Sequence, residues 1–417
     1  DTTPGRHVTG PLAAAGPAPG VSEARRWTIA GLLFASGLIN YLDRSIVAVA
    51  LPLIALDLHL GPAGKGVLLS AFFWSYALMQ VPMGWLADRC DLRWVYAGFF
   101  TAWSLACGFT GFAGAMGTLI VLRIVLGIGE SIYVPGGMKI VSLLFSPKER
   151  GLASGIMNCG TRAGLAVGTP IIAWLVVRVG WKNAFFVIGF SSLIWLVPWL
   201  ATFPARHKLP AAPAHAKHGS VASRLDRNLL ALCTAHICYS YYWYLLVTWL
   251  PDYLVESRHM PIAKAAGCAV VPYLTYAISE PLGGWMADLL IRRGWPELRA
   301  RKTMITVAFL TSLMLLPAGL VTSDFFAVLL LGGAALVGLA TGNILALLQR
   351  SAPGHEVGLW SGFQNFAGNL SGIVAPLATG LLIARTGSHY PGFVVAVVIL
   401  LMGIPIYWLG VRDRIAK

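Results

Sequence analysis

A small set of ionisable side chains interrupts long apolar stretches of this sequence. The set comprises Asp43, Arg44, Arg123, Glu130, Lys139, Arg162 and Glu280. Charged groups placed deep in apolar segments are costly, so by default they mark the path of an ion or a substrate. Their carboxyl groups can exchange protons, and their arginines, which stay charged, can hold an anion. Lys139 lies nearer the end of its segment, where its side chain can also reach the surface.

The composition indicates the solvent that surrounds these stretches. Of 417 residues, 57% are hydrophobic and 12% are charged, and the mean hydropathy is +0.71. A soluble domain carries about 25% charged residues. A soluble enzyme, a disordered chain and a collagen-like protein are therefore excluded, and nucleic-acid binding is a poor explanation of the net charge of +14. The sequence predicts an integral membrane protein, with the lipid bilayer as its partner.

Hydropathy predicts an all-α membrane protein with twelve transmembrane helices, because a helix needs about 20 mainly apolar residues to cross a bilayer. The approximate limits are 27–55, 66–88, 94–114, 117–145, 149–178, 182–203, 227–254, 262–290, 302–322, 325–348, 357–384 and 390–411. The predicted parts are a flexible tail (1–26), a six-helix bundle (27–203), a linker (204–226), a second six-helix bundle (227–411) and a short tail (412–417).

The distribution of Lys and Arg predicts the orientation, because cytoplasmic loops carry an excess of these residues. With the N-terminus inside, the even-numbered loops and both tails hold 21 of the 31 Lys and Arg residues, and the opposite loops hold six. Both termini and the linker are therefore expected to be cytoplasmic. Most of the positive net charge is then explained by the excess of Lys and Arg on the cytoplasmic side of the membrane.

The two halves repeat each other. Residues 76–88 (Y-A-L-M-Q-V-P-M-G-W-L-A-D) match residues 276–288 (Y-A-I-S-E-P-L-G-G-W-M-A-D) at an offset of 200. Residues 151–158 (G-L-A-S-G-I-M-N) likewise match residues 358–365 (G-L-W-S-G-F-Q-N). A parallel duplication of six helices places a substrate site near the midplane, between the halves. The repeat is what a carrier that works by alternating access needs.

The ends of the repeated helices carry charged motifs. G-W-L-A-D-R-C-D-L-R (84–93) resembles a signature of the major facilitator superfamily, although Asp91 replaces the usual glycine. We expect a conformational gate made of Gly84, Asp88 and Arg89, with Asp88 and Arg89 bridging to a neighbouring helix at the cytoplasmic face, and of Asp288 in the second copy. Residues 123–130 resemble the superfamily's R-x-x-x-G motif. Glycines at 160, 164 and 168 predict close packing of helices, because small residues at that spacing let backbones approach.

The interior charges suit a proton-coupled anion carrier. Asp43 and Glu130 are the candidate proton-coupling carboxyls, because burial and arginine partners act oppositely on their ionisation. Arg44 or Arg162 is the candidate anchor for an anionic substrate, since a planar guanidinium matches a carboxylate. Arg123 lies two turns from Glu130 on roughly one helical face. The alternative is a set of structural ion pairs, such as one between Asp43 and Arg123.

Polar and aromatic residues complete the predicted substrate site. Glu280 aligns with Gln80 in the repeat, and both a packing role and a second proton site remain open for it. Residues 239–244 are rich in aromatic rings, a pattern more typical of a packing surface, and one or two of these rings are expected at the substrate. Besides the arginines, the candidate substrate-binding residues are Tyr41, Tyr76, Gln80, Asn158, Tyr239, Asn365 and Asn369.

Several motifs together resemble the anion:cation symporter family of the major facilitator superfamily. They are N-Y-L-D-R (40–44), F-F-W-S-Y-A-L-M-Q-V-P-M-G-W-L-A-D-R (72–89), R-I-V-L-G-I-G-E (123–130), S-P-K-E-R-G-L-A-S-G (146–155), G-W-K-N-A-F-F-V-I-G (180–189) and W-L-P-D-Y-L (249–254). This family includes bacterial carriers of sugar acids, tartrate and phthalate, and animal sialin and the vesicular glutamate transporters. The similarity extends over nearly all of the twelve predicted helices.

The resemblance implies roles for particular residues. It links Asp43 and Glu130 to proton movement, and it links Arg44 and Arg123 to substrate binding and the charge network. Tyr41, Tyr76 and Asn365 or Asn369 fall where sugar-acid carriers make polar contacts. The vesicular glutamate carriers have an arginine where Tyr239 aligns, and Arg162 is not a family-wide feature. Substrate identity is therefore not carried over.

We predict a bacterial inner-membrane symporter that takes up protons with an organic anion, such as a sugar acid or a small hydroxy or dicarboxylic acid. The alternatives are an exchanger or exporter of the same fold and a non-transporting sensor, which usually has an added signalling domain. No catalytic motif predicts an enzyme. The six cysteines are scattered without ligand spacing, so neither a metal nor a cofactor is expected. A monomer is expected.

Overall fold

All regular structure in the described part of the chain is helical. The computed structural model describes residues 21–146, 149–204, 226–353 and 357–413, so most of the predicted tail 1–26, most of the linker 204–226, residues 414–417 and part of the motif 146–155 lie outside it. The first-half helices are α1 (Glu23–Asp57), α2 (Pro62–Arg89), α3 (Leu92–Phe109), α4 (Met116–Glu130), α5 (Tyr133–Leu144), α6 (Arg150–Ser192) and α7 (Leu196–Thr202). The second-half helices are α8 (Arg227–Asp252), α9 (Ile262–Arg292), α10 (Glu297–Thr311), α11 (Leu315–Ala318), α12 (Asp324–Ala334), α13 (Thr341–Ser351), α14 (Val357–Thr386) and α15 (Tyr390–Pro405).

Short polar side chains start several of these helices. Ser22 caps α1, which begins four residues before the predicted limit of the first span. Asp91, which replaces the usual glycine of the loop motif, accepts a hydrogen bond from the amide of Arg93 at 3.0 Å and caps α3. Such caps satisfy backbone N–H groups that a first helical turn leaves unpaired.

The helices account for twelve membrane crossings. Nine helical segments of the described chain are long and apolar enough to cross a membrane, and one of them, 152–202, is a double crossing. Its chain reverses at Gly180, whose φ of 80° favours glycine. After the reversal, Trp181 donates to Asp57 and Trp195 donates to the Leu32 carbonyl, so this half runs antiparallel to α1. The shorter α3, and α10 continued by α11, correspond to the two remaining predicted spans.

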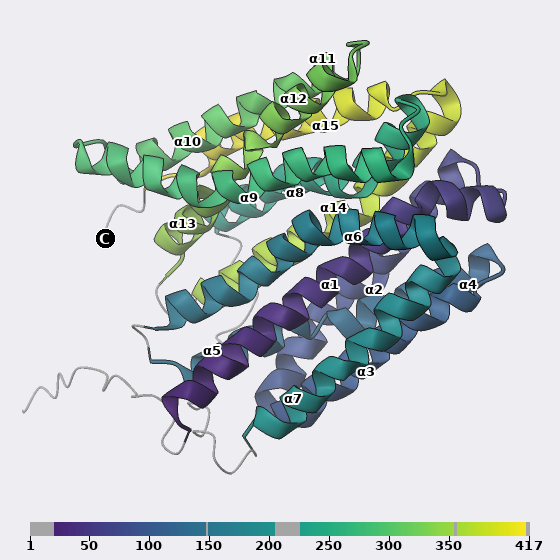
Figure 1. The fold of residues 1–417 in the computed structure, drawn as a ribbon. Coiled ribbons are helices and arrows are strands. Elements are labelled where there is room, and N and C mark those ends of the chain that lie inside the picture. The colour runs from purple at the N-terminus through teal and green to yellow at the C-terminus, as the bar shows by residue number, and fades with distance from the viewer. Residues whose placement is uncertain (1–20, 147–148, 205–225, 354–356, 414–417) are drawn as a thin grey trace, which may run out of the picture.

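The helices form two bundles with separate cores. Figure 1 shows the first-half helices, purple to teal, below the second-half helices, green to yellow, with α6 and α14 at their junction. One hydrophobic core gathers mainly residues of α1 to α7, and the other gathers mainly residues of α8 to α15. The all-helical membrane architecture agrees with the sequence prediction.

The repeat in the sequence is also a repeat in packing. α6 packs along α1, and its repeat partner α14 packs along α8. Gly160 and Gly164 lie against the α1 backbone at Phe34 and Leu38, where a methyl group would collide with the carbonyl oxygens. In the other half, Ser371 of α14 donates to the Ile237 carbonyl of α8 at 2.9 Å. The close packing predicted from the glycine spacing is therefore present.

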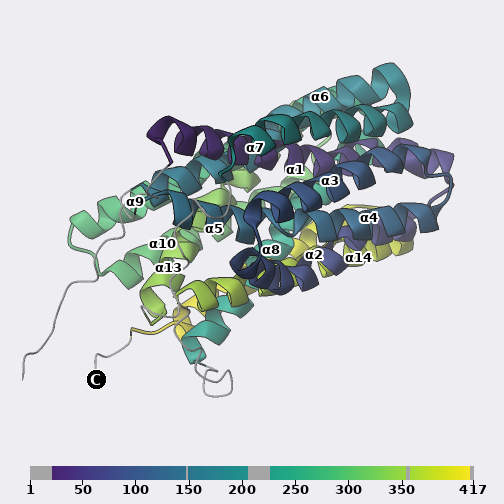
Figure 2. The same ribbon diagram turned by 90° about the horizontal axis from the view of Figure 1, so that it is seen from below.

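The bundles meet more tightly at one end than at the other. We call the end that bears Arg26 and Arg350 the terminal end, where α5, α7, α10 and α13 lie (left in Figure 1), and the opposite end the far end. Figure 2 shows α5, α10 and α13 gathered at the terminal end from a second direction. At the far end, a Cβ built on Gly66 of α2 would lie 2.7 Å from the Pro376 carbonyl of α14. Among the described residues, the Arg26–Glu149 and Arg350–Asp413 ion pairs at the terminal end each lie within one bundle, whereas the Lys65–Asp252 pair at the far end joins the bundles.

Candidate functional site

An arginine–glutamate pair lies at the centre of the first bundle. The Nε atom of Arg44 on α1 is 2.6 Å from the Oε2 atom of Glu130 at the end of α4, and the Glu130 side chain is fully buried. The Arg44 guanidinium lies over the rings of Tyr76, Phe72 and Tyr41, at 4.4, 4.6 and 5.2 Å from their centroids. Aromatic faces and a carboxylate thus share this one cation.

Asp43 and Arg123 lie beside this pair but do not bridge to each other. Asp43 is fully buried, and neither carboxyl oxygen has a hydrogen-bond partner among the described residues. Arg123 is 4% exposed and lies over the Phe72 ring at 5.1 Å. The pair formed is Arg44–Glu130 rather than the Asp43–Arg123 bridge that the sequence suggested as an alternative. The centre of the bundle therefore holds two carboxyls and two guanidinium groups with a single close ion pair.

A second arginine–glutamate pair joins the two bundles. The Nε and Nη2 atoms of Arg162 on α6 donate to the two carboxylate oxygens of Glu280 on α9, at 2.9 and 2.6 Å. The Arg162 guanidinium also lies over the rings of Tyr276 and Trp243, at 5.1 and 5.2 Å. The side chains of Arg162 and Glu280 are 25% and 19% exposed. This pair is therefore accessible, unlike Glu130.

The glycines of α6 explain where Arg162 points. Because each residue turns a helix by about 100°, a residue two positions from Gly160 and Gly164 faces roughly the opposite side. The glycines face α1 inside their own bundle. Arg162 therefore faces α9 in the other bundle. On α9, the same periodicity places Tyr276 and Glu280 on one face, and Leu274 and Ile278 on the exposed face.

Hydroxyl groups cluster in the second bundle next to the Arg162 pair. The Tyr239 hydroxyl on α8 contacts the Tyr276 hydroxyl and lies 2.6 Å from Oγ1 of Thr341. One turn and a half further along α8, the Tyr244 hydroxyl donates to Oδ1 of Asn369 at 2.7 Å. The ring of Tyr244 also packs edge-on against Phe73 of the first bundle, at 4.5 Å. These contacts bring Tyr239 and Asn369, both predicted from the sequence, to the interface between the bundles.

Three other predicted substrate-binding residues take no part in these arginine and hydroxyl contacts. Asn158 and Asn365 are exposed in the structure. Gln80 is half-buried, and its Nε2 atom has no hydrogen-bond partner among the described residues. Their part in substrate binding stays a prediction.

The charged loop motifs hold neighbouring helices together within each bundle. Asp88 of α2 pairs with Lys139 of α5 at 2.6 Å, the kind of bridge that the motif predicted, while Arg89 lies over the Trp85 ring. Gly84 is close to α5 as well, since a Cβ there would lie 4.0 Å from Pro135. In the second copy, Asp288 pairs with Arg301 at 3.3 Å. Their role as a gate stays a prediction.

A buried cluster of charged side chains at the far end was not predicted from the sequence. Nζ of Lys65 on α2 lies 2.8 Å from Oδ1 of Asp252 on α8 and 3.3 Å from Oε1 of Glu256. The other Asp252 oxygen lies 3.0 Å from Nε2 of His389, whose Nδ1 atom lies 2.7 Å from the Ser257 hydroxyl. Lys65 lies between the first two predicted spans, where the sequence predicts a loop, and only the W-L-P-D-Y-L motif indicated Asp252. The cluster ties the two bundles together where they are closest.

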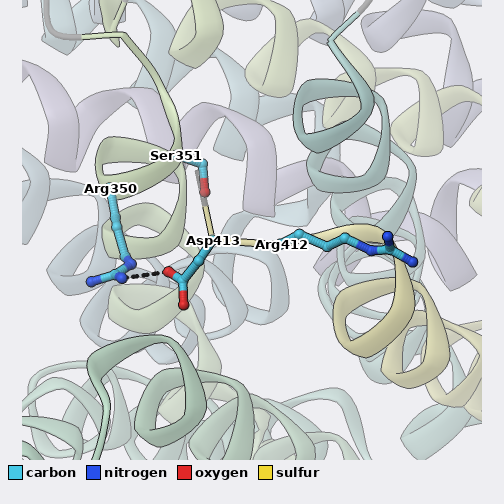
Figure 3. A pocket seen from close by; sticks show the side chains of 4 residues that line it. All are labelled: Arg350, Ser351, Arg412 and Asp413. Carbon is cyan, nitrogen blue, oxygen red and sulfur yellow. Dashed lines mark hydrogen bonds and ion pairs between the residues drawn. The ribbon is translucent and has the colours of Figure 1, made fainter. Parts of the chain in front are cut away.

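A separate hollow of about 270 Å³ lies at the terminal end, away from these groups. It is lined by Arg350 and Ser351 of α13 and by Arg412 and Asp413, and Figure 3 shows Arg350 reaching Asp413 across it. The distance between their charged atoms is 2.5 Å. None of the predicted site residues lines this hollow, so it is not the candidate substrate site.

Comparisons with known proteins establish the family. The chain matches the family model described as Major Facilitator Superfamily over residues 33–293 and 232–417. It is 30% identical to a "Probable galactarate/D-glucarate transporter" of Escherichia coli K12 (94% of each chain covered) and 31% identical to a "D-galactonate transporter" of Escherichia coli O6:H1 (93% and 96%). It is also 31% identical to a "Probable sulfoacetate transporter" of Cupriavidus necator (91% and 92%).

The fold also matches that of a solved transporter structure. A bacterial homolog of the human lysosomal transporter Spinster, in an inward-facing and occupied conformation, superposes with a TM-score of 0.79 at 19% identity, covering 94% of this chain and 98% of that one. The chain belongs to the major facilitator superfamily and to its anion:cation symporter family, as the sequence motifs predicted. It is a multi-pass membrane transporter, not an enzyme.

Proposed function

We propose that this protein takes up an organic anion together with protons, by alternating access across a bacterial inner membrane with both termini in the cytoplasm. The sugar-acid transporters among its relatives make a sugar acid or a related small hydroxy acid the favoured substrate. With this orientation, the far end faces the periplasm. The tight contacts there then describe a carrier that is closed outside and faces inward.

The observation that carries the proposal is the buried Arg44–Glu130 pair with Asp43 beside it. An anion that binds the Arg44 guanidinium must compete with the Glu130 carboxylate. A carboxylate that loses its counter-ion in a buried site is strongly destabilised, and a proton removes that cost. Substrate binding and protonation at Glu130 are thereby linked.

Asp43 gives the same bundle a second proton acceptor. Its carboxyl is fully buried next to the Cys107 thiol and lies within electrostatic range of Glu130, Arg44 and Arg123. In the proposed cycle, the outward-open carrier accepts protons on Asp43 and Glu130, and the substrate carboxylate binds Arg44. The bundles then rock, and the protons and the anion leave into the cytoplasm.

A ligand screen tests the substrate class. Sugar acids, tartrates, aromatic acids and acidic amino acids are added to purified protein, and its thermal unfolding is followed. We expect one class to raise Tm, since a ligand at about 100 times its Kd adds about 2.7 kcal/mol of stability. The Arg44→Ala variant should lose this shift, whereas Arg25→Ala, at the terminal end, should keep it. A shift of the same size in Arg44→Ala contradicts the assigned anchor, and no shift with any anion contradicts the substrate class.

An exchanger of the same fold is the second candidate, because its site needs the same anchor. Imposed proton gradients distinguish the two functions. A symporter accumulates the anion when only a proton gradient is present, whereas an exchanger requires a counter-anion inside the vesicle.

A further inference from the structure

The contacts of Arg162 resemble those of Arg44, but its tyrosine and glutamate partners come from the second bundle. Tyr76 and Tyr276 are equivalent in the repeat, at an offset of 200. Arg44 lies over the Tyr76 ring at 4.4 Å, and Arg162 lies over the Tyr276 ring at 5.1 Å. Each guanidinium holds one protein carboxylate, with shortest distances of 2.6 Å in both pairs. The molecule therefore contains two units of similar construction, one inside the first bundle and one that spans the bundle interface.

Two tyrosines connect these units. Tyr41 and Tyr244 are each within electrostatic range of both Arg44 and Arg162. Tyr41 belongs to the first bundle but packs against the core of the second, and Tyr244 packs against both cores. The two guanidinium groups are thus both near Tyr41 and Tyr244, in the region where the bundles meet.

The Arg162 unit is arranged for exchange of its carboxylate. Both Arg162 donors that contact Glu280 form a planar fork, which a carboxylate of any origin can accept. The Arg162 and Glu280 side chains keep 25% and 19% exposure, so an incoming anion can reach them. Replacing one carboxylate by another preserves both charge-assisted hydrogen bonds. A neutral hydroxyl in the same place would leave the guanidinium without its counter-ion.

From these observations we infer that Arg162 binds a second, distal carboxylate of the substrate, and that Glu280 is the internal counter-ion which this carboxylate replaces. The inference rests on the proposed function, in which Arg44 binds the first carboxylate. It specifies the substrate class as a dicarboxylate with an anionic group at each end. Glu280 then acts as a specificity residue, because it occupies Arg162 whenever the substrate end is neutral.

Two acids that differ only at the distal end test this inference. D-Glucarate has a carboxylate where D-gluconate has a hydroxymethyl group. Binding of each is measured by calorimetry on the purified full chain. Wild-type protein should bind glucarate at least about tenfold more tightly, because only glucarate has a distal carboxylate that can take the place of Glu280 on Arg162. The Arg162→Gln/Glu280→Gln double variant, which keeps the site neutral, should bind the two acids within about threefold of each other.

A single variant and a control complete the experiment. Glu280→Gln removes the competing carboxylate and should bind glucarate several-fold more tightly than wild type. Lys264→Gln removes a far-end charge that pairs with Asp324, and it should keep the wild-type preference. A glucarate preference that persists in the double variant, or weaker glucarate binding by Glu280→Gln, overturns this inference alone. Failure of wild-type protein to bind either acid overturns the proposed substrate class together with it.

Discussion

At the scale of single residues, two interior arginines each pair with a glutamate at a distance of 2.6 Å. Arg44 pairs with Glu130, and Arg162 pairs with Glu280. Isolated charges would be very costly at these depths, and pairing reduces the cost. Because the pairing carboxylates resemble the carboxylate of an anionic substrate, the same contacts that stabilise the empty carrier can be exchanged for substrate contacts. Structural and functional roles therefore coincide in these residues.

A glutamate at the terminal end gives a residue-scale prediction for pH. The pKa of Glu149 lies below its ordinary value, because the Ser146 hydroxyl at 2.8 Å and the Arg26 guanidinium at 3.0 Å donate to its carboxylate. A lowered pKa means that these contacts stabilise the fold fully above the ordinary glutamate pKa of about 4.3. Their contribution is lost as the pH falls through the lowered pKa of the folded protein.

We therefore expect Glu149→Gln to have a lower Tm than wild type at pH 7, and the difference to disappear towards pH 3. Thermal unfolding in lipid nanodiscs across this range measures it. Glu23→Gln, at an exposed site in the first turn of α1, is the matched control and should change Tm little. A Tm difference for Glu149→Gln that stays constant with pH contradicts this account.

At the scale of helices, the far end is held by α2, α8 and α14. The Lys65–Asp252 pair joins α2 to α8, and the backbones of α2 and α14 touch at Gly66 and Gly380. Alternating access requires that these contacts separate when the carrier opens outward. The Lys65 cluster thus stabilises the arrangement in which the far end is closed, which faces inward in the orientation that we propose.

Removing the Lys65 charge should shift the carrier towards the outward-open state. A cysteine placed at position 73, where Phe73 packs on Gly372 of the other bundle, reports on opening when the native cysteines are serine. We expect Lys65→Gln to raise its labelling by a membrane-impermeant thiol reagent about tenfold, since a buried charged hydrogen bond contributes about 1.5–3 kcal/mol. Lys264→Gln, whose partner Asp324 lies in its own bundle, should leave labelling unchanged. Equal labelling with and without Lys65 would show that the cluster does not hold this end closed.

Helices and family were predictable from the sequence, and individual pairings were not. Hydropathy, the repeat and the glycine spacing depend on local pattern, so they predicted the spans and a close helix contact at the glycines of α6, and the structure shows that the partner is α1. Arg44 and Arg123 could each pair with either Asp43 or Glu130, so the sequence cannot decide which of these ion pairs forms. Lys65 and Asp252 come from different bundles and meet only in the closed far end. The repeat pairing of Tyr76 with Tyr276, by contrast, contained the signal for the second guanidinium–tyrosine unit.

At the scale of the molecule, two similar bundles enclose the charged groups and are joined by ion pairs at the centre and at the far end. In the proposed mechanism, the centre contact carries an exchangeable carboxylate, and the far-end contact opens and closes access. The duplication gives each bundle the same helix packing, which lets one bundle rock against the other around a shared site. Proton coupling at Asp43 and Glu130 is the central claim that connects this architecture to transport.

Uptake into proteoliposomes with an imposed inward proton gradient tests that claim most directly. Wild-type protein should accumulate the organic anion above its external concentration. Glu130→Gln and Asp43→Asn should lose this accumulation while retaining exchange of labelled for unlabelled anion at least in part. Gradient-driven accumulation equal to wild type in both variants would contradict the account.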